Sequence, residues 1–139
     1  MPIDSVRVSA KAKDELIRLK KRTGIENWNT LCRWALCHSL AQNIGDALPF
    51  IDHASDSNIE MTWRTFSGGR EELYWALVRE RCRRDGLDAT DEKVVANQFR
   101  LHLHRGIQYL ASNKGLDISK LVQKVTEQKT NTQAQLSAN

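Results

Sequence analysis

One stretch of the chain, if it forms a helix, has apolar residues around most of the helix circumference. Its apolar positions are Trp28, Leu31, Cys32, Trp34, Ala35, Leu36 and Leu40. A helix this apolar is buried on several sides, so the sequence predicts that it lies at the centre of a core or in a subunit interface. We expect it to run from a cap at Asn27 or Asn29 to about Gln42. A chain of 139 residues suits one domain packed around such a helix.

The residues before this helix predict a short strand followed by a first helix. Residues 3–8 are rich in β-branched side chains, which favour a strand. Ser9 is a typical N-cap, because its hydroxyl can accept from a free backbone N–H of the first turn. The helix should run from about Ala10 to Thr23 and end at Gly24, which adopts the left-handed conformation readily. Its buried stripe is predicted to be Ala12, Leu16 and Leu19, with Ile17 beside it.

The second half predicts more helices and one further strand. We expect a loop over 43–58, a half-buried strand over 59–66, helices over about 70–84, 90–113 and 118–127, and a polar, disordered tail over 128–139. Gly86 should end the helix over 70–84, and Thr90 should cap the next one. The core face of that long helix is predicted to contain Val95, Phe99, Leu103, Ile107 and Leu110. The fold class is therefore mainly α.

The sequence contains few features of a catalytic site. There is no CxxC, HExxH or P-loop motif, and His102 and His104 lie two apart, so they point in different directions on a helix. We expect one histidine on the core side and the other at the surface. The three cysteines make no disulfide framework and are expected to be reduced residues buried in helices. No secretory signal or membrane span is apparent, so we expect a cytoplasmic protein. Because no catalytic or metal-binding motif is apparent, we also expect a protein that needs no metal or cofactor and is not an enzyme.

The positive charge of the chain is concentrated in its first third. Residues 1–42 contain eight Lys or Arg against four Asp or Glu, a net charge of +4, whereas residues 43–139 contain 13 of each and are neutral. Such an asymmetry favours a polyanionic partner for the first third, although a solvated basic helix face is an equally common cause. Four arginines at 79, 81, 83 and 84 are interleaved with Glu80 and Asp85, which favours ion pairs within the chain.

The order of strand, capped helix, glycine and second helix in residues 6–36 resembles the ribbon-helix-helix family of DNA-binding proteins. In that family two chains pair their strands into a ribbon, and their helices interlock. One short strand and two helices bury little apolar surface alone, so dimerisation would follow. Arg7 would be the only charged residue aimed at DNA bases, flanked by Ser5 and Ser9. This set is too small for strong sequence-specific recognition.

A resemblance that covers roughly residues 3–125 is to the DndE family of DNA phosphorothioation proteins. It rests on His102-Leu103-His104-Arg105-Gly106-Ile107, on Tyr109-Leu110 and on the N-terminal segment from Ser5 to Leu40. The resemblance implies a non-enzymatic subunit that acts with other Dnd proteins in DNA sulfur modification. It also implies a homotetramer that binds duplex DNA containing a nick, without strong sequence preference.

Together these features predict a single DNA-binding domain over residues 1–127, with the basic strand-helix-helix over 1–42 and a strand plus helices over 59–127. An alternative is a scaffold that docks partner proteins through the same basic face, with DNA contact incidental. Phosphate contacts are assigned to the basic residues of the strand and first helix, because the positive charge is concentrated in residues 1–42. Such contacts carry no information about base sequence. These residues are Arg7, Lys11, Lys13, Arg18, Lys20, Lys21 and Arg22.

Overall fold

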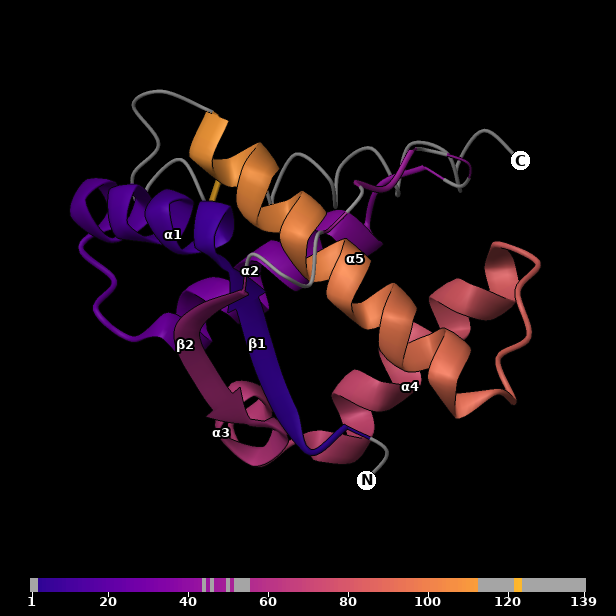
Figure 1. The fold of residues 1–139 in the computed structure, drawn as a ribbon. Helices are drawn as coiled ribbons and strands as arrows, with labels where there is room; N and C mark the ends of the chain where they lie inside the picture. Colours follow the sequence, from indigo (N-terminus) through magenta and orange to yellow (C-terminus); the bar gives the residue numbers. More distant parts are fainter. Residues whose placement is uncertain are drawn as a thin grey trace.

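The computed structural model describes residues 3–43, 45, 47–49, 51, 56–112 and 122–123. Helices dominate this part of the chain, as predicted, and a two-stranded antiparallel sheet accompanies them (Figure 1). In chain order the elements are β1 (Ser5–Ser9), α1 (Ala10–Thr23), α2 (Trp28–Leu40), β2 (Asp56–Thr62), α3 (Trp63–Ser67), α4 (Glu71–Arg84) and α5 (Glu92–Ser112).

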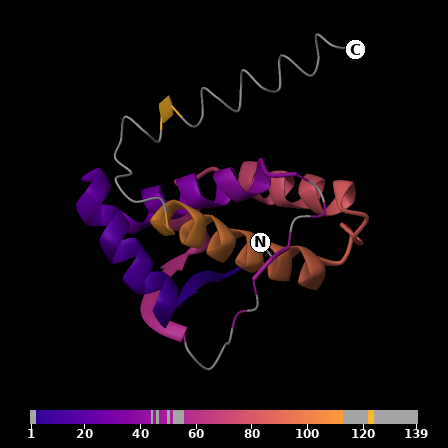
Figure 2. The same cartoon turned by 90° about the horizontal axis from the view of Figure 1, so that it is seen from above.

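The core is organised around the crossing of α2 and α5. These helices make the most extensive contact between any two helices, and α1 and α4 also pack against α5 (Figures 1 and 2). The buried face of α2 includes Leu31, Ala35 and Leu36. The prediction that α2 is central to a core is therefore confirmed within one chain. All five residues predicted for the core face of α5 are buried.

The strand β1 pairs antiparallel with β2 of the same chain, with Val6 opposite Met61 and Arg7 opposite Glu60. The edge of β1 that does not face β2 lies against α5, because Arg100 donates to the carbonyl oxygen of Arg7 at 3.1 Å. The ribbon between two chains that the ribbon-helix-helix resemblance implies is thus not confirmed. In this structure the ribbon is completed within one chain.

Both ends of α1 follow the predicted signals. The Ser9 hydroxyl accepts from the Ala12 N–H at 3.1 Å, and Gly24 ends the helix with a φ of 73°. Positive φ is the conformation that glycine adopts with least strain. The predicted stripe of Ala12, Leu16 and Leu19 is buried, whereas Ile17 is 36% exposed.

The predicted strand over 59–66 is wrong in its second half. The strand begins earlier, at Asp56, and ends at Thr62, whose hydroxyl accepts from the Thr65 N–H at 3.0 Å and so caps the short helix α3. The turn places Trp63 and Phe66 on one side of α3, where both are buried against Phe99 of α5. Tertiary burial of these rings decided the conformation that alternation alone misassigned.

Other predicted boundaries need smaller corrections. The helix α2 ends at Leu40 and not at Gln42. Thr90 does not cap α5, because its hydroxyl donates to Asp88, and the Asp91 carboxylate accepts from the Lys93 N–H instead. Cys32 and Cys82 are buried as predicted, but Cys37 is exposed. Most of the predicted helix over 118–127 and all of the tail over 128–139 lie outside the described residues.

Candidate nucleic-acid interface

The basic residues of α1 form two rows on opposite sides of its exposed face. Lys13 and Lys20 are seven residues apart and therefore share one side of the helix, whereas Lys11 and Arg18 share the other. Lys21 lies between the rows. The sequence predicts phosphate contacts for all of these residues, and helical spacing alone already spreads them over different faces. The buried stripe of α1 fixes which way each row points.

The first row faces β2 and the start of α2. Lys13 Nζ donates to the Asn58 side-chain oxygen at 2.7 Å, and Lys20 Nζ lies 4.4 Å from the centre of the Trp28 ring. The second contact is a cation–π interaction, which holds the lysine and the indole together. Both lysines are only partly exposed, and Lys13 lines a cavity between these elements.

The second row points toward the end of α5. Lys11 and Arg18 are exposed, and Arg22 donates to the Ala111 carbonyl oxygen at 2.8 Å. The charges of Lys11 and Arg18 act on the buried Glu15, whose pKa is nevertheless raised because burial dominates. Lys11, Arg18 and Lys21 have no hydrogen bond or ion pair among the described residues. They are the cations of α1 most available to an external anion.

Arg7 is partly neutralised within the chain. Its guanidinium donates to Glu60 across the strands at 2.9 Å, with both side chains about half exposed. The hydrogen bond from Arg7 keeps the pKa of the Glu60 carboxyl below its usual value. An exposed pair of this kind contributes little to stability, but it balances the charge of the outward face of the ribbon. Arg7 therefore belongs to a less positive surface than the helix α1.

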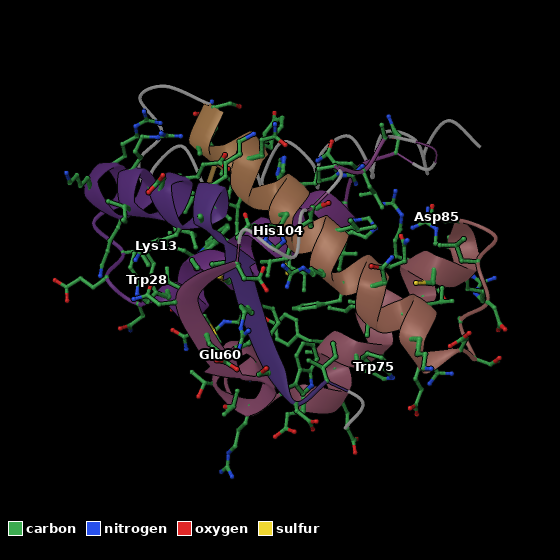
Figure 3. The ribbon with its side chains drawn as sticks, viewed as in Figure 1. Lys13, Trp28, Glu60, Trp75, Asp85 and His104 are labelled. Atoms are coloured by element: carbon green, nitrogen blue, oxygen red, sulfur yellow. The ribbon has the colours of Figure 1, made fainter. Side chains whose placement is uncertain are left out.

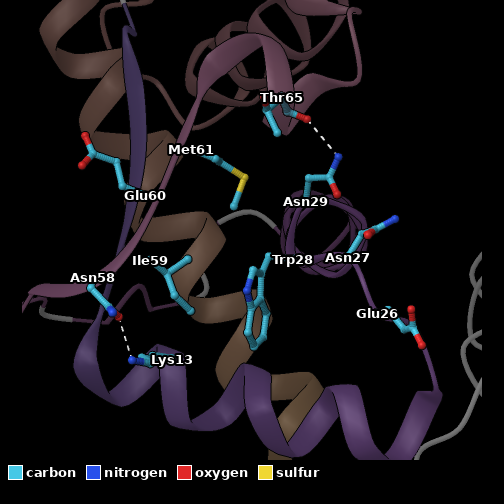
Figure 4. Close-up of a pocket in the computed structure, with 10 residues that line it drawn as sticks. All are labelled: Lys13, Glu26, Asn27, Trp28, Asn29, Asn58, Ile59, Glu60, Met61 and Thr65. Carbon is cyan, nitrogen blue, oxygen red and sulfur yellow. Dashed lines mark hydrogen bonds between the residues drawn. The ribbon is translucent and has the colours of Figure 1, made fainter.

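A cavity of about 480 Å³ separates α1, β2 and the start of α2. Figure 4 shows the Trp28 side chain reaching from α2 toward α1, with Ile59 and Met61 facing it from β2. Glu60 and Glu26 point away from this space in the same view. The sequence gives no sign of the cavity, because its walls come from three separate segments that only folding brings together. The remaining lining residues are Lys13, Asn27, Asn29, Asn58 and Thr65.

Two of the four arginines of α4 pair with carboxylates within the chain, as their spacing predicted, whereas Arg79 and Arg84 are exposed. Arg83 pairs with Glu80 at 2.6 Å, and Arg81 pairs with Asp85 at 3.0 Å. Arg81 is buried and also donates to three carbonyl oxygens at the end of α2 and just after it, those of Leu40, Gln42 and Asn43. Arg81 thus secures the end of α2. Asp85 and Trp75 lie on the opposite side of the molecule from Lys13 and Trp28 (Figure 3).

The two histidines of α5 are both buried, so the expectation that one lies at the surface is wrong. His104 accepts the Ser9 N–H on Nε2 at 3.0 Å, and its Nδ1 lies 2.8 Å from the Arg100 carbonyl oxygen. This arrangement places the proton of His104 on Nδ1. The contact joins the start of α1 to α5, 95 residues away in the chain.

His102 lies in a different polar cluster on the side of α5 that faces α2. Its Nδ1 lies 2.9 Å from the Ser39 hydroxyl, which also accepts from Arg105 at 2.8 Å. Burial, reinforced by the positive charge of Arg105, lowers the pKa of His102 to about 4. The ring is therefore neutral at physiological pH. Its Nε2 has no partner among the described residues.

Neither a metal-binding cluster nor a membrane span is present in the part of the chain that the structure describes. No three His, Cys, Asp or Glu side chains converge there as metal ligands would. None of the helices within the same residues combines the length and apolar character needed to cross a bilayer.

Comparison with known proteins identifies the family. No curated protein matches the chain. A family model does match, described as DNA sulphur modification protein DndE, and its match extends over residues 5–117. This range contains every element from β1 to α5, and it includes both α1 and the cavity beside it. The chain therefore belongs to the DndE family of DNA sulphur modification proteins.

Proposed function

We propose that this protein is a DNA-binding subunit of a DNA sulfur modification system. It holds duplex DNA, preferably nicked duplex, through phosphate contacts and without strong sequence preference. Other Dnd proteins supply the sulfur chemistry, and this subunit acts with them in the cytoplasm as a non-enzymatic component. Family membership supports the role in DNA sulfur modification, and the charges of α1 support the phosphate contacts.

The observation that carries the proposal is the exposed positive charge of α1. The net charge of +4 is confined to residues 1–42, and Lys11, Arg18 and Lys21 are exposed on that helix. A contact between a cation and a DNA phosphate is favourable because it releases counterions condensed on the DNA. Cations without partners in the chain gain the most binding free energy, since they give up no ion pair to make this contact. On α4, Arg81 and Arg83 gain less because they already pair with carboxylates. The exposed Arg79 and Arg84 belong to residues 43–139, whose net charge is zero.

The outward face of the ribbon supports the absence of strong sequence preference. Base recognition needs side chains that present hydrogen bonds to base edges in a groove. On this face Arg7 already donates to Glu60, and the neighbouring Ser5 and Thr62 are short. A surface with one paired arginine is poorly equipped to distinguish base pairs, whereas the lysines of α1 suit the uniform phosphate backbone.

The proposal includes self-association, up to the homotetramer that the family resemblance implies. The apolar circumference of α2 predicted a core or a subunit interface, and α2 packs its apolar face inside the chain. Several large apolar residues are exposed among the described residues, and two of them, Leu73 and Leu77, are 48% and 41% exposed and stand one turn apart on α4. We therefore place a subunit contact at α4. Assembly would bring several copies of the basic helix α1 into one DNA-binding particle.

Binding of the purified protein to naked duplex DNA tests the function. Fluorescence anisotropy with a labelled intact duplex and a nicked duplex of the same sequence, each titrated at several salt concentrations, gives affinity and its salt dependence. We expect log affinity to fall linearly with log salt, with a slope of about 0.9 per phosphate contact, and the nicked duplex to bind more tightly. Absence of salt-dependent binding to either duplex would overturn the proposal and favour the scaffold that docks an acidic protein partner.

A further inference from the structure

The cavity between α1, β2 and the start of α2 has the size and the wall chemistry of a small-ligand site. Its volume of about 480 Å³ lies within the range of roughly 300–1,000 Å³ that such sites occupy. One wall is apolar and consists of Trp28, Ile59 and Met61. Polar groups at the edge come from Lys13 and from Asn29 and Asn58 (Figure 4). An apolar slot with a few hydrogen-bonding groups suits a flat, heteroaromatic ligand.

The Trp28 ring is held in place for such a ligand. Lys20 lies over the ring at 4.4 Å from its centre, and Trp28 also packs against the hydrophobic core. Ile59 and Met61 stand opposite the indole across the cavity (Figure 4). A planar group that enters the space between them contacts the indole on one side and aliphatic side chains on the other, and stacking on an aromatic side chain is how proteins hold unpaired bases.

Hydrogen-bonding groups are also present at the cavity edge. Lys13 Nζ uses one of its three N–H donors on Asn58, and the Asn29 side-chain nitrogen uses one of its two on the Thr65 carbonyl oxygen at 3.1 Å. The donors that remain suit the ring nitrogens and carbonyl oxygens of a base. The carboxylates of Glu26 and Glu60 point away from the slot (Figure 4), and Glu60 is paired with Arg7.

We infer that this cavity binds one unstacked nucleobase of DNA, with Trp28 as its stacking partner. The inference rests on the proposed function, because the exposed cations of α1 would hold phosphates of the DNA that carries the base. In an intact duplex each base is stacked on its neighbours and exposes only its edges, so its flat face cannot reach the indole. A base at a strand interruption leaves the stack at a lower free-energy cost than a base within an intact duplex. The cavity recognises such an unstacked base.

Titration of the wild-type protein with mononucleotides tests the site directly. The chain has four tryptophans, so a ¹⁵N–¹H spectrum contains four indole signals, and Trp28→Phe identifies the signal of Trp28. We expect dAMP to shift the Trp28 signal and to leave those of Trp34, Trp63 and Trp75 in place. Deoxyribose 5-phosphate, which lacks the base, should not shift it. No shift with dAMP, or an equal shift with both compounds, would overturn the inference.

A second experiment uses nicked duplexes that carry one unpaired residue at the nick, either thymidine or an abasic analogue. Loss of one base–aromatic stack of about 1–3 kcal/mol corresponds to about 5- to 150-fold in affinity. We expect the thymidine duplex to bind at least about fivefold more tightly than the abasic duplex, and Trp28→Ala to abolish this difference. Trp34→Ala, on the same helix but outside the cavity, should keep it. Circular dichroism establishes that both variants are folded.

The intact duplex distinguishes failure of this inference from failure of the proposed function. If the intact duplex binds with the expected salt dependence while the thymidine and abasic duplexes bind equally, the cavity is not a base site and the phosphate-binding function stands. If no duplex binds in a salt-dependent manner, the proposed function fails, and the dAMP titration alone decides whether the cavity accepts a base.

Discussion

The Ala35 carbonyl group on α2 occupies the space that a side chain at Gly106 of α5 would need. A Cβ atom built at Gly106 would lie 1.8 Å from the Ala35 carbonyl oxygen and 2.4 Å from its carbon. The two helices therefore cross with their backbones in direct contact. Because α2 is also the helix that carries Trp28 and Asn29 to the cavity, this contact sets the position of one wall of the candidate site.

Gly106→Ala should destabilise the protein. Alanine has a better helix propensity than glycine by about 1 kcal/mol, but its methyl group would meet backbone, which cannot rotate away. Helix separation or a strained backbone should outweigh that gain, and overpacking of this kind costs about 1–3 kcal/mol or more. Urea unfolding of the wild type, Gly106→Ala and Gly106→Val measures the effect. The loss should grow with side-chain size, and an alanine variant as stable as the wild type would contradict the crossing geometry.

His104→Leu should destabilise the protein at the junction between β1 and α1. The Ser9 N–H donates to His104 Nε2 at 3.0 Å in a buried position, and leucine would leave that donor without a partner. An unsatisfied buried donor costs about 1–3 kcal/mol. His104→Gln offers an oxygen in a similar place and should recover part of the loss. Thermal unfolding of the three proteins gives the order, and equal stability of the leucine and glutamine variants would rule out this role for the hydrogen bond.

Acidification should destabilise the fold through His102. The pKa of this ring is lowered from 6.5 to about 4 by burial and by Arg105, so below about pH 6.5 the unfolded chain binds a proton that the folded chain does not. The free energy of unfolding therefore falls as the pH drops from about 6.5 to 4, by an amount on the order of 3 kcal/mol.

The comparison for His102 is with His102→Gln, which cannot take up this proton. Unfolding free energies measured by urea titration between about pH 7 and pH 4 should fall more steeply for the wild type than for the variant. The other histidines are common to both proteins, so the difference between the two curves isolates His102. Parallel curves would show that His102 titrates alike in the folded and unfolded states.

Lys11→Ala/Lys21→Ala should weaken DNA binding and flatten its salt dependence. Both lysines are exposed on α1, and removal of each phosphate contact should reduce the slope of log affinity against log salt by about 0.9. The weakening should be similar for unrelated DNA sequences, since phosphates carry no base information. Stability should change little, because exposed cations contribute little to it.

The matched control for these lysines is Arg79→Ala/Arg84→Ala on α4, which removes the same charge from another exposed surface. Gel-shift titration on intact and nicked duplexes compares the two double variants. We expect the α4 variant to bind nearly as the wild type does. If the α4 variant loses binding while the α1 variant retains it, the DNA-binding face has been misplaced.

Leu73→Glu/Leu77→Glu should shift the protein toward monomer. The two leucines form an exposed apolar pair on α4, and two carboxylates from each copy would repel across a shared contact. Light scattering at micromolar concentration should give a mass well above 15.9 kDa for the wild type and a lower one for the variant. A wild-type mass of 15.9 kDa would disprove self-association, and an unchanged mass for the variant would place the contact elsewhere.

The sequence by itself determined the elements whose signals are local. Ser9, Gly24 and the stripe of Ala12, Leu16 and Leu19 defined α1, because caps and helical periodicity act within a few residues. The apolar circumference of α2 indicated a central helix for the same reason. The concentration of positive charge in the first third of the chain also follows from the order of the amino acids alone.

Only the tertiary structure decided how these elements meet. Alternation extended the second strand to Phe66, but burial of Trp63 and Phe66 against Phe99 made α3 instead. The backbone contact at Gly106 and the cavity at Trp28 depend on residues far apart in the chain. Their geometry follows from packing of whole helices against one another, and periodicity within one segment carries no information about which segment it will face.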